Sequence, residues 1–333
     1  MSGRAGRAAG VVVGVAVASA LLVTCFVTAG HAPALHGVQV ATVAPDSVRT
    51  LLQQGLDRAV PGAIDLVPSP GPGTARAAVT DRAAYAAFVV TPSGGTLSVA
   101  RAASAPVAAA LEAAFTHALA ATHRSLTVVD LRPLPAGDPQ GVSSLLTVIP
   151  LSIASLAAAV VLWLVDRDLS GGIRLALLLL YAVVAGLLAG LVGATSGAFA
   201  GHGWTVALGG GALALAVSWF TAGALRLLGP AGAGLSGVLV IALGFPSSGG
   251  ATAPQMLPTV WRTLSPLLPP GAAVPLLRNL VYFDGHAIGG PLLTLGVFAL
   301  LGLVGCLVPR RSDRSRPAEP TTGTTSSPAV TPA

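Results

Sequence analysis

The sequence contains no lysine, so all 18 of its basic residues are arginines. A P-loop needs a lysine for the nucleotide phosphates, and Schiff-base enzymes need a lysine amine. A protein-kinase fold needs a lysine on its third strand. We therefore expect no Walker-type ATPase site, no Schiff-base centre and no kinase centre in this chain.

Charge of either sign is scarce. Charged residues make up 9% of the 333 residues, whereas an average soluble domain has about 25%. Hydrophobic residues make up 53%, and the mean hydropathy is +0.79. This composition is typical of an integral membrane protein.

Cysteine and histidine are too few and too scattered for a metal site. The two cysteines, Cys25 and Cys306, are predicted near opposite ends of two membrane helices, so a disulfide between them is not expected. Four histidines (His31, His36, His117 and His123) show no ligand spacing with cysteines. No nucleophile–base pair stands out either. We predict no cofactor, no metal and no enzyme activity.

Six apolar runs have about the length that a membrane-spanning helix needs. They cover residues 10–30, 142–165, 173–197, 204–225, 227–245 and 288–308. Gly229 and Pro230 interrupt the fifth run. The first run is an alternative candidate for a cleaved signal peptide, but its apolar core is longer than the usual 7–15 residues, which favours a retained anchor. A lipoprotein signal at Cys25 is disfavoured because Thr24 precedes the cysteine.

The arginines predict the orientation. With the N-terminus in the cytoplasm, every short inner loop and both tails carry arginine, as the positive-inside rule expects. These nine arginines are Arg4, Arg7, Arg167, Arg174, Arg226, Arg310, Arg311, Arg314 and Arg316. The basic pI of 10.6 then indicates topology rather than nucleic-acid binding. We expect a multi-pass protein of the plasma membrane with both termini cytoplasmic.

Residues 31–141 are long enough for one extracytoplasmic domain, inserted between the first and second membrane helices. Strands are predicted at 38–44, 63–67, 85–90, 96–100 and 125–134. Helices are predicted from residue 46, over 74–84 and from residue 104. The pattern indicates a mixed α/β fold whose sheet buries one set of alternate residues. The remaining chain forms a membrane domain over 142–309 and a disordered, polar cytoplasmic tail over 310–333.

The membrane segments carry small residues and no ionisable group away from their ends. Ion-coupled transporters place ionisable groups inside the membrane, so proton coupling is not expected. Gly186 and Gly190, like Gly193 and Gly197, have the small-xxx-small spacing that lets helices approach closely. We interpret these four glycines as helix-packing residues.

Residues 246–287 are too broken by proline to span a membrane and too apolar for a solvated loop. Residues 271–283 fit a short amphipathic helix, with Pro275 in its first turn and Arg278 at its polar edge. We expect an outer segment that lies in the membrane interface or re-enters the bundle. Its candidate functional residues are Trp261, Arg262, Pro269, Pro270, Arg278, Tyr282, Phe283 and Asp284.

This segment resembles the outer re-entrant region of type-2 ABC exporter permeases, and within them the actinobacterial phage-infection-protein (YhgE/Pip-like) branch. The matching positions are Pro246, Ser248, Gly249, Leu257, Pro258, 268–271, 276–278 and 282–285. The order of one helix, a large outer domain and five helices is also similar to that branch.

The resemblance implies a permease subunit that exports a hydrophobic or lipid-like substrate, paired with a second copy or a paralogue and driven by a separate ATPase. The family receives its ATPase partly on the loop between the second and third helices. Here that loop is short, and its candidate coupling residues are Asp166, Arg167, Asp168 and Arg174. A second hypothesis is a non-transporting membrane protein whose outer domain binds an envelope, phage or secretion partner.

Overall fold

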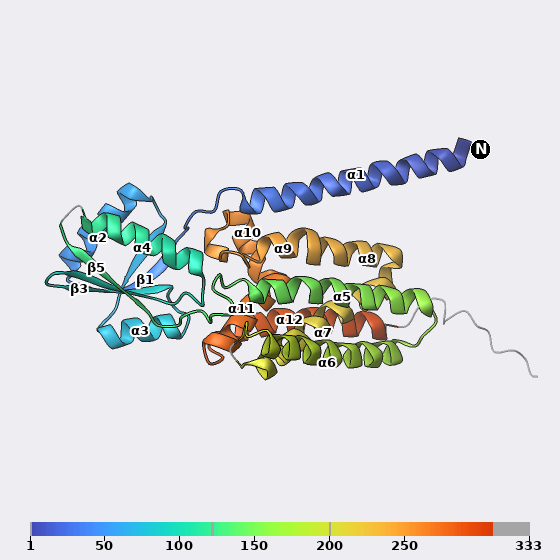
Figure 1. Ribbon diagram of the computed structural model, residues 1–333. Coiled ribbons are helices and arrows are strands. Elements are labelled where there is room, and N and C mark those ends of the chain that lie inside the picture. The colour runs from blue at the N-terminus through green and yellow to red at the C-terminus, as the bar shows by residue number, and fades with distance from the viewer. Residues whose placement is uncertain (1, 121–122, 200, 309–333) are drawn as a thin grey trace, which may run out of the picture.

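The computed structural model describes residues 2–120, 123–199 and 201–308, and it has two parts. A bundle of long helices adjoins a smaller domain built on a β-sheet (Figure 1). We call the end of the bundle beside the sheet the domain end and the opposite end the far end. The predicted disordered tail, 310–333, lies outside the described residues.

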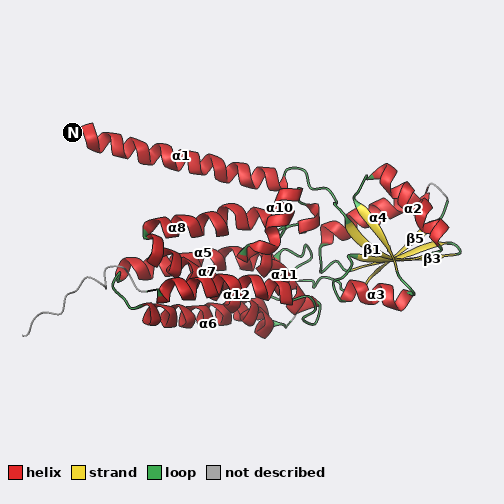
Figure 2. Cartoon of the chain, turned by 180° about the vertical axis from the view of Figure 1, so that it is seen from behind, coloured by secondary structure: helices red, strands yellow, loops and turns green. Residues whose placement is uncertain are grey.

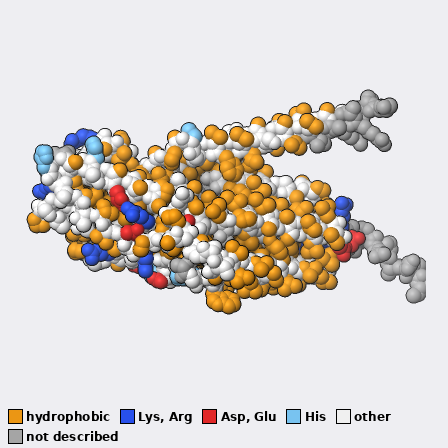
Figure 3. Space-filling view, viewed as in Figure 1, with side chains coloured by type: hydrophobic (Ala, Val, Ile, Leu, Met, Phe, Trp, Pro, Cys, Tyr) orange, Lys and Arg blue, Asp and Glu red, His pale blue; other side chains and the backbone are white. Residues whose placement is uncertain are grey.

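As predicted, six helical stretches are long and apolar enough to cross a membrane. The central helix α7 packs against α5, α6 and α12, whereas α1 lies along the outside of the bundle (Figures 1 and 2). Hydrophobic side chains cover the bundle, and charged ones gather over the sheet domain and at the far end (Figure 3). The five uninterrupted helices are α1 (Ser2–Gly30), α5 (Ser143–Val165), α6 (Gly171–Thr195), α7 (Gly203–Leu228) and α12 (Gly289–Leu307).

The fifth span starts later than predicted. Gly229 has a φ of +60° and ends α7, so the span runs over Pro230–Ser247 rather than from residue 227. Glycine tolerates this φ at little cost, and Pro230 then opens the next helix. The span consists of α8 (Pro230–Gly237), a π-helical stretch η1 (Val238–Gly244) and α9 (Phe245–Ser247).

The sheet domain has the element order that the sequence predicts. Its five strands lie in the order β2-β1-β3-β4-β5, with only the β3–β4 hairpin antiparallel. The elements are β1 (Val38–Val43), α2 (Asp46–Ala59), β2 (Ile64–Pro68), α3 (Pro72–Thr80), β3 (Ala86–Thr91), β4 (Gly94–Val99), α4 (Ala105–Ala120) and β5 (Ser125–Asp130).

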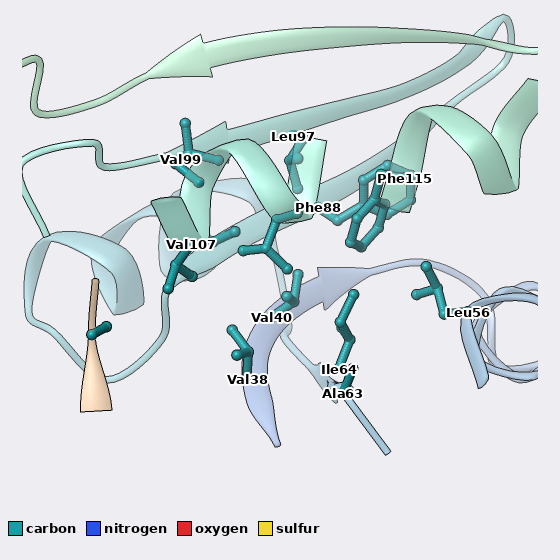
Figure 4. Packing of buried hydrophobic residues seen from close by; sticks show 14 of the residues in the cluster. Val38, Val40, Leu56, Ala63, Ile64, Phe88, Leu97, Val99, Val107 and Phe115 are labelled. Carbon is teal, nitrogen blue, oxygen red and sulfur yellow. The ribbon is translucent and has the colours of Figure 1, made fainter. Parts of the chain in front are cut away.

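The prediction that the sheet buries one set of alternate residues was wrong. Helices cover both of its faces, α3 on one and α2 with α4 on the other (Figure 1). Consecutive residues of β3, Ala86, Ala87 and Phe88, are therefore all buried. On the α2 and α4 face, the ring centroids of Phe88 and Phe115 are 4.8 Å apart (Figure 4).

Residues 246–287, here called the junction segment, fill the domain end of the bundle. The segment contains η2 (Pro254–Met256), α10 (Thr259–Leu264), η3 (Ser265–Leu267) and α11 (Pro269–Tyr282). Of the two expected placements, interfacial or re-entrant, the structure has the second: α11 is buried against α7, α12 and α5. Pro269 and Pro270 open the helix, so Pro275 lies in its interior and not in its first turn.

Candidate functional site

Arg278 does not lie at a polar edge, as the sequence predicted, but is only 6% exposed. Its guanidinium donates to the backbone oxygens of Ala103 (3.3 Å), Gly141 (3.0 Å) and Gly250 (2.7 Å). Burial lowers the pKa of Arg278 to about 10, so the side chain stays cationic at neutral pH. One side chain thus ties the sheet domain, the linker before α5 and the junction segment together.

The junction segment also supplies residues to the hydrophobic core on each face of the sheet. Met256 and Ala253 join the cluster under α2 and α4, which includes Val38 and Phe115. Phe283, fully buried, joins the cluster on the α3 face. Burying large apolar side chains stabilises a fold by roughly 1.5–3 kcal/mol each. The sheet domain therefore completes its two cores with residues from the membrane domain.

Polar contacts reinforce this attachment. Arg132 pairs with Asp284 at 2.6 Å, and Arg262 donates to the backbone oxygen of His36 at 2.9 Å. Further bonds run from the hydroxyl of Ser104 to the carbonyl of Thr252 (2.7 Å) and from Tyr85 to Gln255. Hydrogen bonds, an ion pair and shared hydrophobic cores thus join the junction segment to the sheet domain.

The other predicted junction residues have less direct roles. Pro269 and Pro270 are buried at the first turn of α11, and Trp261 on α10 is partly exposed. Tyr282 donates to the carbonyl oxygen of Ala198 at 3.3 Å, which links α11 to the turn after α6. Burial raises the pKa of Tyr282 to about 12, so its hydroxyl keeps its proton and remains a donor.

A groove with a volume of about 710 Å³ lies between α5 and α6 in the domain half of the bundle. We call it the lateral groove. Both helices pack against α7 far more than against each other, so they diverge along this stretch. Exposed Leu146, Leu188 and Val192 on its walls place it on the surface of the bundle. Its walls are mostly apolar, as a hydrophobic ligand requires.

The small residues of α6 lie on two sides of the helix, one against α7 and one along the lateral groove. Gly186 and Gly190 face α7, where an added Cβ would collide with the α7 backbone, and Gly193 leaves room for the ring of Phe199. Ala185 and Ala189 line the lateral groove instead. The packing role predicted for the first three glycines agrees with these close contacts.

Gly197 is the exception, because it does not pack within a helix. It follows the end of α6 at Thr195 and has a φ of +72°, in the left-handed region that favours glycine. The neighbouring backbone there is so close to Gly137 that a Cβ on Gly137 would overlap it. Gly197 therefore shapes the turn that closes the groove at the domain end.

The lateral groove has polar groups at both ends. Tyr181 lines the end away from the sheet domain and shares a hydrogen bond of 3.3 Å with Ser155, which is buried behind it. Ser143, Thr147 and Ser196 line the end near the sheet domain. On the α5 wall Pro150 lacks an N–H, which leaves the carbonyl oxygen of Leu146 without its usual helical donor. The groove can thus hold an elongated apolar molecule that carries a polar group.

At the far end, the predicted coupling residues do not share one surface. Asp166, Arg167 and Asp168 are exposed, and the Arg167 guanidinium stacks on the ring of Trp163 at 4.6 Å. Arg174, in contrast, is 2% exposed and donates to the backbone oxygen of Asp166 at 2.8 Å. Arg174 holds the loop in place, and of these four residues only the other three are exposed.

The sequence did not predict the lateral groove. A signal was present in α6, where Tyr181, Ala185, Ala189 and Gly193 recur every four residues on one side. This stripe marks a second face of α6. Whether that face lines a groove depends on the distance between α5 and α6, which is not a local property of the sequence. Both cysteines are free, as predicted, and within the described ranges no three His, Cys, Asp or Glu side chains gather as a metal site.

No protein-family model, no curated protein and no solved structure matches this chain.

Proposed function

We propose that this chain is the membrane subunit of an exporter that moves a hydrophobic or lipid-like molecule, driven by a separate ATPase. The lateral groove carries the proposal, because it opens sideways from the bundle and combines apolar walls with polar ends. A lipid-like molecule has the same division into apolar chain and polar head. The resemblance to type-2 ABC exporter permeases points to the same function.

In the proposed orientation the far end lies in the cytoplasm and the sheet domain lies outside. Arg167, Arg174 and Arg226 all belong to the far end, and the positive-inside rule assigns such loops to the cytoplasm. The lateral groove then faces the outer half of the bilayer. A substrate would leave through it into the outer leaflet or past the junction segment.

A partner bound at the far end would act directly on the two helices of the lateral groove. Loop 166–170 joins α5 to α6, the two helices that form the walls of the groove. A partner that holds Asp166, Arg167 and Asp168 would move these helices relative to each other. Gly171 at the start of α6 packs against the backbone of Cys306, so α12 would move as well. As in the similar permeases, a second copy or a paralogue would complete the transporter.

Purification of the tagged full-length chain from its host membranes tests the proposal. We expect an ABC ATPase to elute with it, encoded by a neighbouring gene, and its ATP turnover to rise when both are reconstituted together. If no ATPase of the host forms a complex with the chain, the permease function is wrong.

The second hypothesis, a docking protein for an envelope, phage or secretion partner, is supported by strand β5. This strand forms one edge of the sheet, and its Val128 and Val129 side chains are exposed. Exposed strand edges pair readily with a strand of another protein. This function would be favoured if an envelope protein, and no ATPase, is recovered with the wild-type chain. Changing Val128 to lysine should then abolish the recovery of that envelope protein.

A further inference from the structure

A second cavity, of about 220 Å³, lies where the sheet domain meets α11. It is separate from the lateral groove and shares no lining residue with it. Several of its walls are polar or charged, in contrast to the apolar groove. The polar lining residues are Arg82, Tyr85, Ser248, Gln255, Arg278 and Asn279.

The cavity carries two positive charges that no lining carboxylate balances. Arg82 and Arg278 are its only charged lining residues. Among the described residues, neither guanidinium forms an ion pair with a carboxylate. Two cations close together in a partly buried site repel each other and attract an anion.

Three carboxylates lie nearby, and the charge of buried Asp138 partly offsets that of Arg278. Asp138 accepts hydrogen bonds from the backbone N–H groups of Val142 and Ser143, both at 3.0 Å, and so stabilises the start of α5. Asp284 pairs with Arg132. Asp81 lies 3.7 Å from the ring of His286. None of these three acids lines the cavity.

Arg82 is held in place before any ligand arrives. Its Nε donates to the side-chain oxygen of Asn279 at 3.1 Å. Its guanidinium lies over the rings of Tyr85 (5.3 Å) and Phe283 (4.8 Å). Its backbone φ is +67°, unusual for a residue other than glycine. Within the described part of the chain, its two Nη atoms donate no hydrogen bond, so they are available to a ligand.

We propose that this cavity binds a phosphate group, with Arg82 as the main ligand and Arg278 supplying the second positive charge. Arginine forks match phosphate oxygens in pairs, so Arg82 can bind two of them, while Arg278, whose Nη atoms already donate to backbone oxygens, acts through its charge. The phosphate belongs either to a free anion or to the headgroup of a phospholipid beside the junction segment. This inference does not depend on the transport function.

Binding to purified full-length protein in detergent and in nanodiscs tests the proposal. Inorganic phosphate is titrated against delipidated protein, and native mass spectrometry measures phosphatidylglycerol retained from nanodiscs of phosphatidylcholine and phosphatidylglycerol. Arg82→Gln removes one charge and should weaken binding about tenfold or more. Arg58→Gln makes the same change on exposed α2, across the sheet, and should bind like the wild type.

A second variant guards against a loss of binding caused by misfolding. Asn279→Asp keeps an oxygen for Arg82 Nε and adds an internal carboxylate that competes with phosphate. It should abolish phosphate binding; it also loses the amide donor to the Ala287 carbonyl oxygen, so its unfolding temperature is measured and binding is assayed well below it.

If the wild type binds inorganic phosphate and both variants lose this binding, the site is supported and its ligand is a free anion. If the wild type retains only phosphatidylglycerol and both variants lose it, the site is supported and its ligand is a lipid headgroup. The proposal is overturned if the wild type binds neither, or if both variants bind as well as the wild type.

Discussion

The two ends of the helical bundle differ in how much of the chain they use. At the domain end, the junction segment folds into four short helices and inserts into both cores of the sheet domain. At the far end, loop 166–170 and the turn at Gly229 connect the helices directly. The domain end is therefore tied to the sheet domain by many contacts, whereas the described connections at the far end are short.

A buried arginine stabilises each end, and the comparison shows what each connects. Arg278 joins backbone oxygens from three separate regions, Ala103, Gly141 and Gly250. Arg174 donates to the carbonyl oxygen of Asp166, in the preceding loop. The first joins the sheet domain to the bundle, and the second supports the loop at the far end. Four changes, at the two ends and along the bundle between them, should differ in their effects, from the largest to the smallest.

Arg278→Leu should have the largest effect. It leaves three backbone oxygens without their donor, and at roughly 1 kcal/mol or more each the loss is about 3 kcal/mol. We expect normal membrane insertion but a sheet domain (31–141) that proteases cut readily, with a lower unfolding temperature in detergent. Arg58→Leu, at an exposed position, should change stability by less than about 0.5 kcal/mol. Wild-type protease resistance of the Arg278 variant would show that the attachment does not depend on this residue.

Gly186→Val should have the next largest effect. A Cβ at this position would lie only 2.9 Å from the backbone of Gly211, so α6 and α7 must separate. Overpacking of this kind costs about 1–3 kcal/mol. Thermal unfolding in detergent measures it, with Gly296→Val on α12 as the control, because nothing lies within 4 Å of that position. Equal unfolding temperatures for the two variants would argue against close α6–α7 packing.

Ala154→Phe should barely change stability but should impair function. The new ring would occupy the lateral groove, which Ala154 lines. We expect ATP turnover in the reconstituted complex to lose its stimulation by substrate lipid. Ala157→Phe, exposed on the same helix but outside the groove, should behave as the wild type does. If both variants retain full stimulation, the groove is not the substrate path.

Arg167→Ala should have a modest effect, because the contact that it removes is exposed. It removes a cation–π contact with Trp163 that is worth about 0.5–1 kcal/mol at an exposed site. The same change should reduce the affinity of the ATPase in a pull-down if the loop is its docking surface. Arg167→Lys retains the charge and should be intermediate. Unchanged ATPase binding by Arg167→Ala would remove this residue from the coupling surface.

The sequence predicted the membrane helices and the order of the sheet elements, because both depend on local patterns. Apolar runs and Gly–Pro breaks indicate where a helix spans and where it ends. The strand near residue 86 was likewise visible from its own side chains. That it is buried on both faces was not, because this depends on α3 covering one face and α4 the other.

The role of Arg278 shows the limit of local patterns. Its place on α11 suggested a polar edge, since a charged residue usually faces water. Its actual partners, Ala103 and Gly141, lie far away in the sequence and contribute backbone oxygens that no side-chain pattern reveals. Gly197 was misinterpreted for a related reason. Its spacing continued the pattern of α6, but the helix had already ended at Thr195.

The insertion of Met256 and Phe283 into the sheet domain has a consequence for synthesis. The ribosome completes residues 31–141 long before it reaches these two residues. At about 10 residues per second, the interval is on the order of ten seconds. During this time the nascent domain has two unfilled hydrophobic sites, and it reaches its final stability only after the fifth span has been made. We therefore expect a fragment that ends at residue 141 to be a poor substitute for the domain in the full chain.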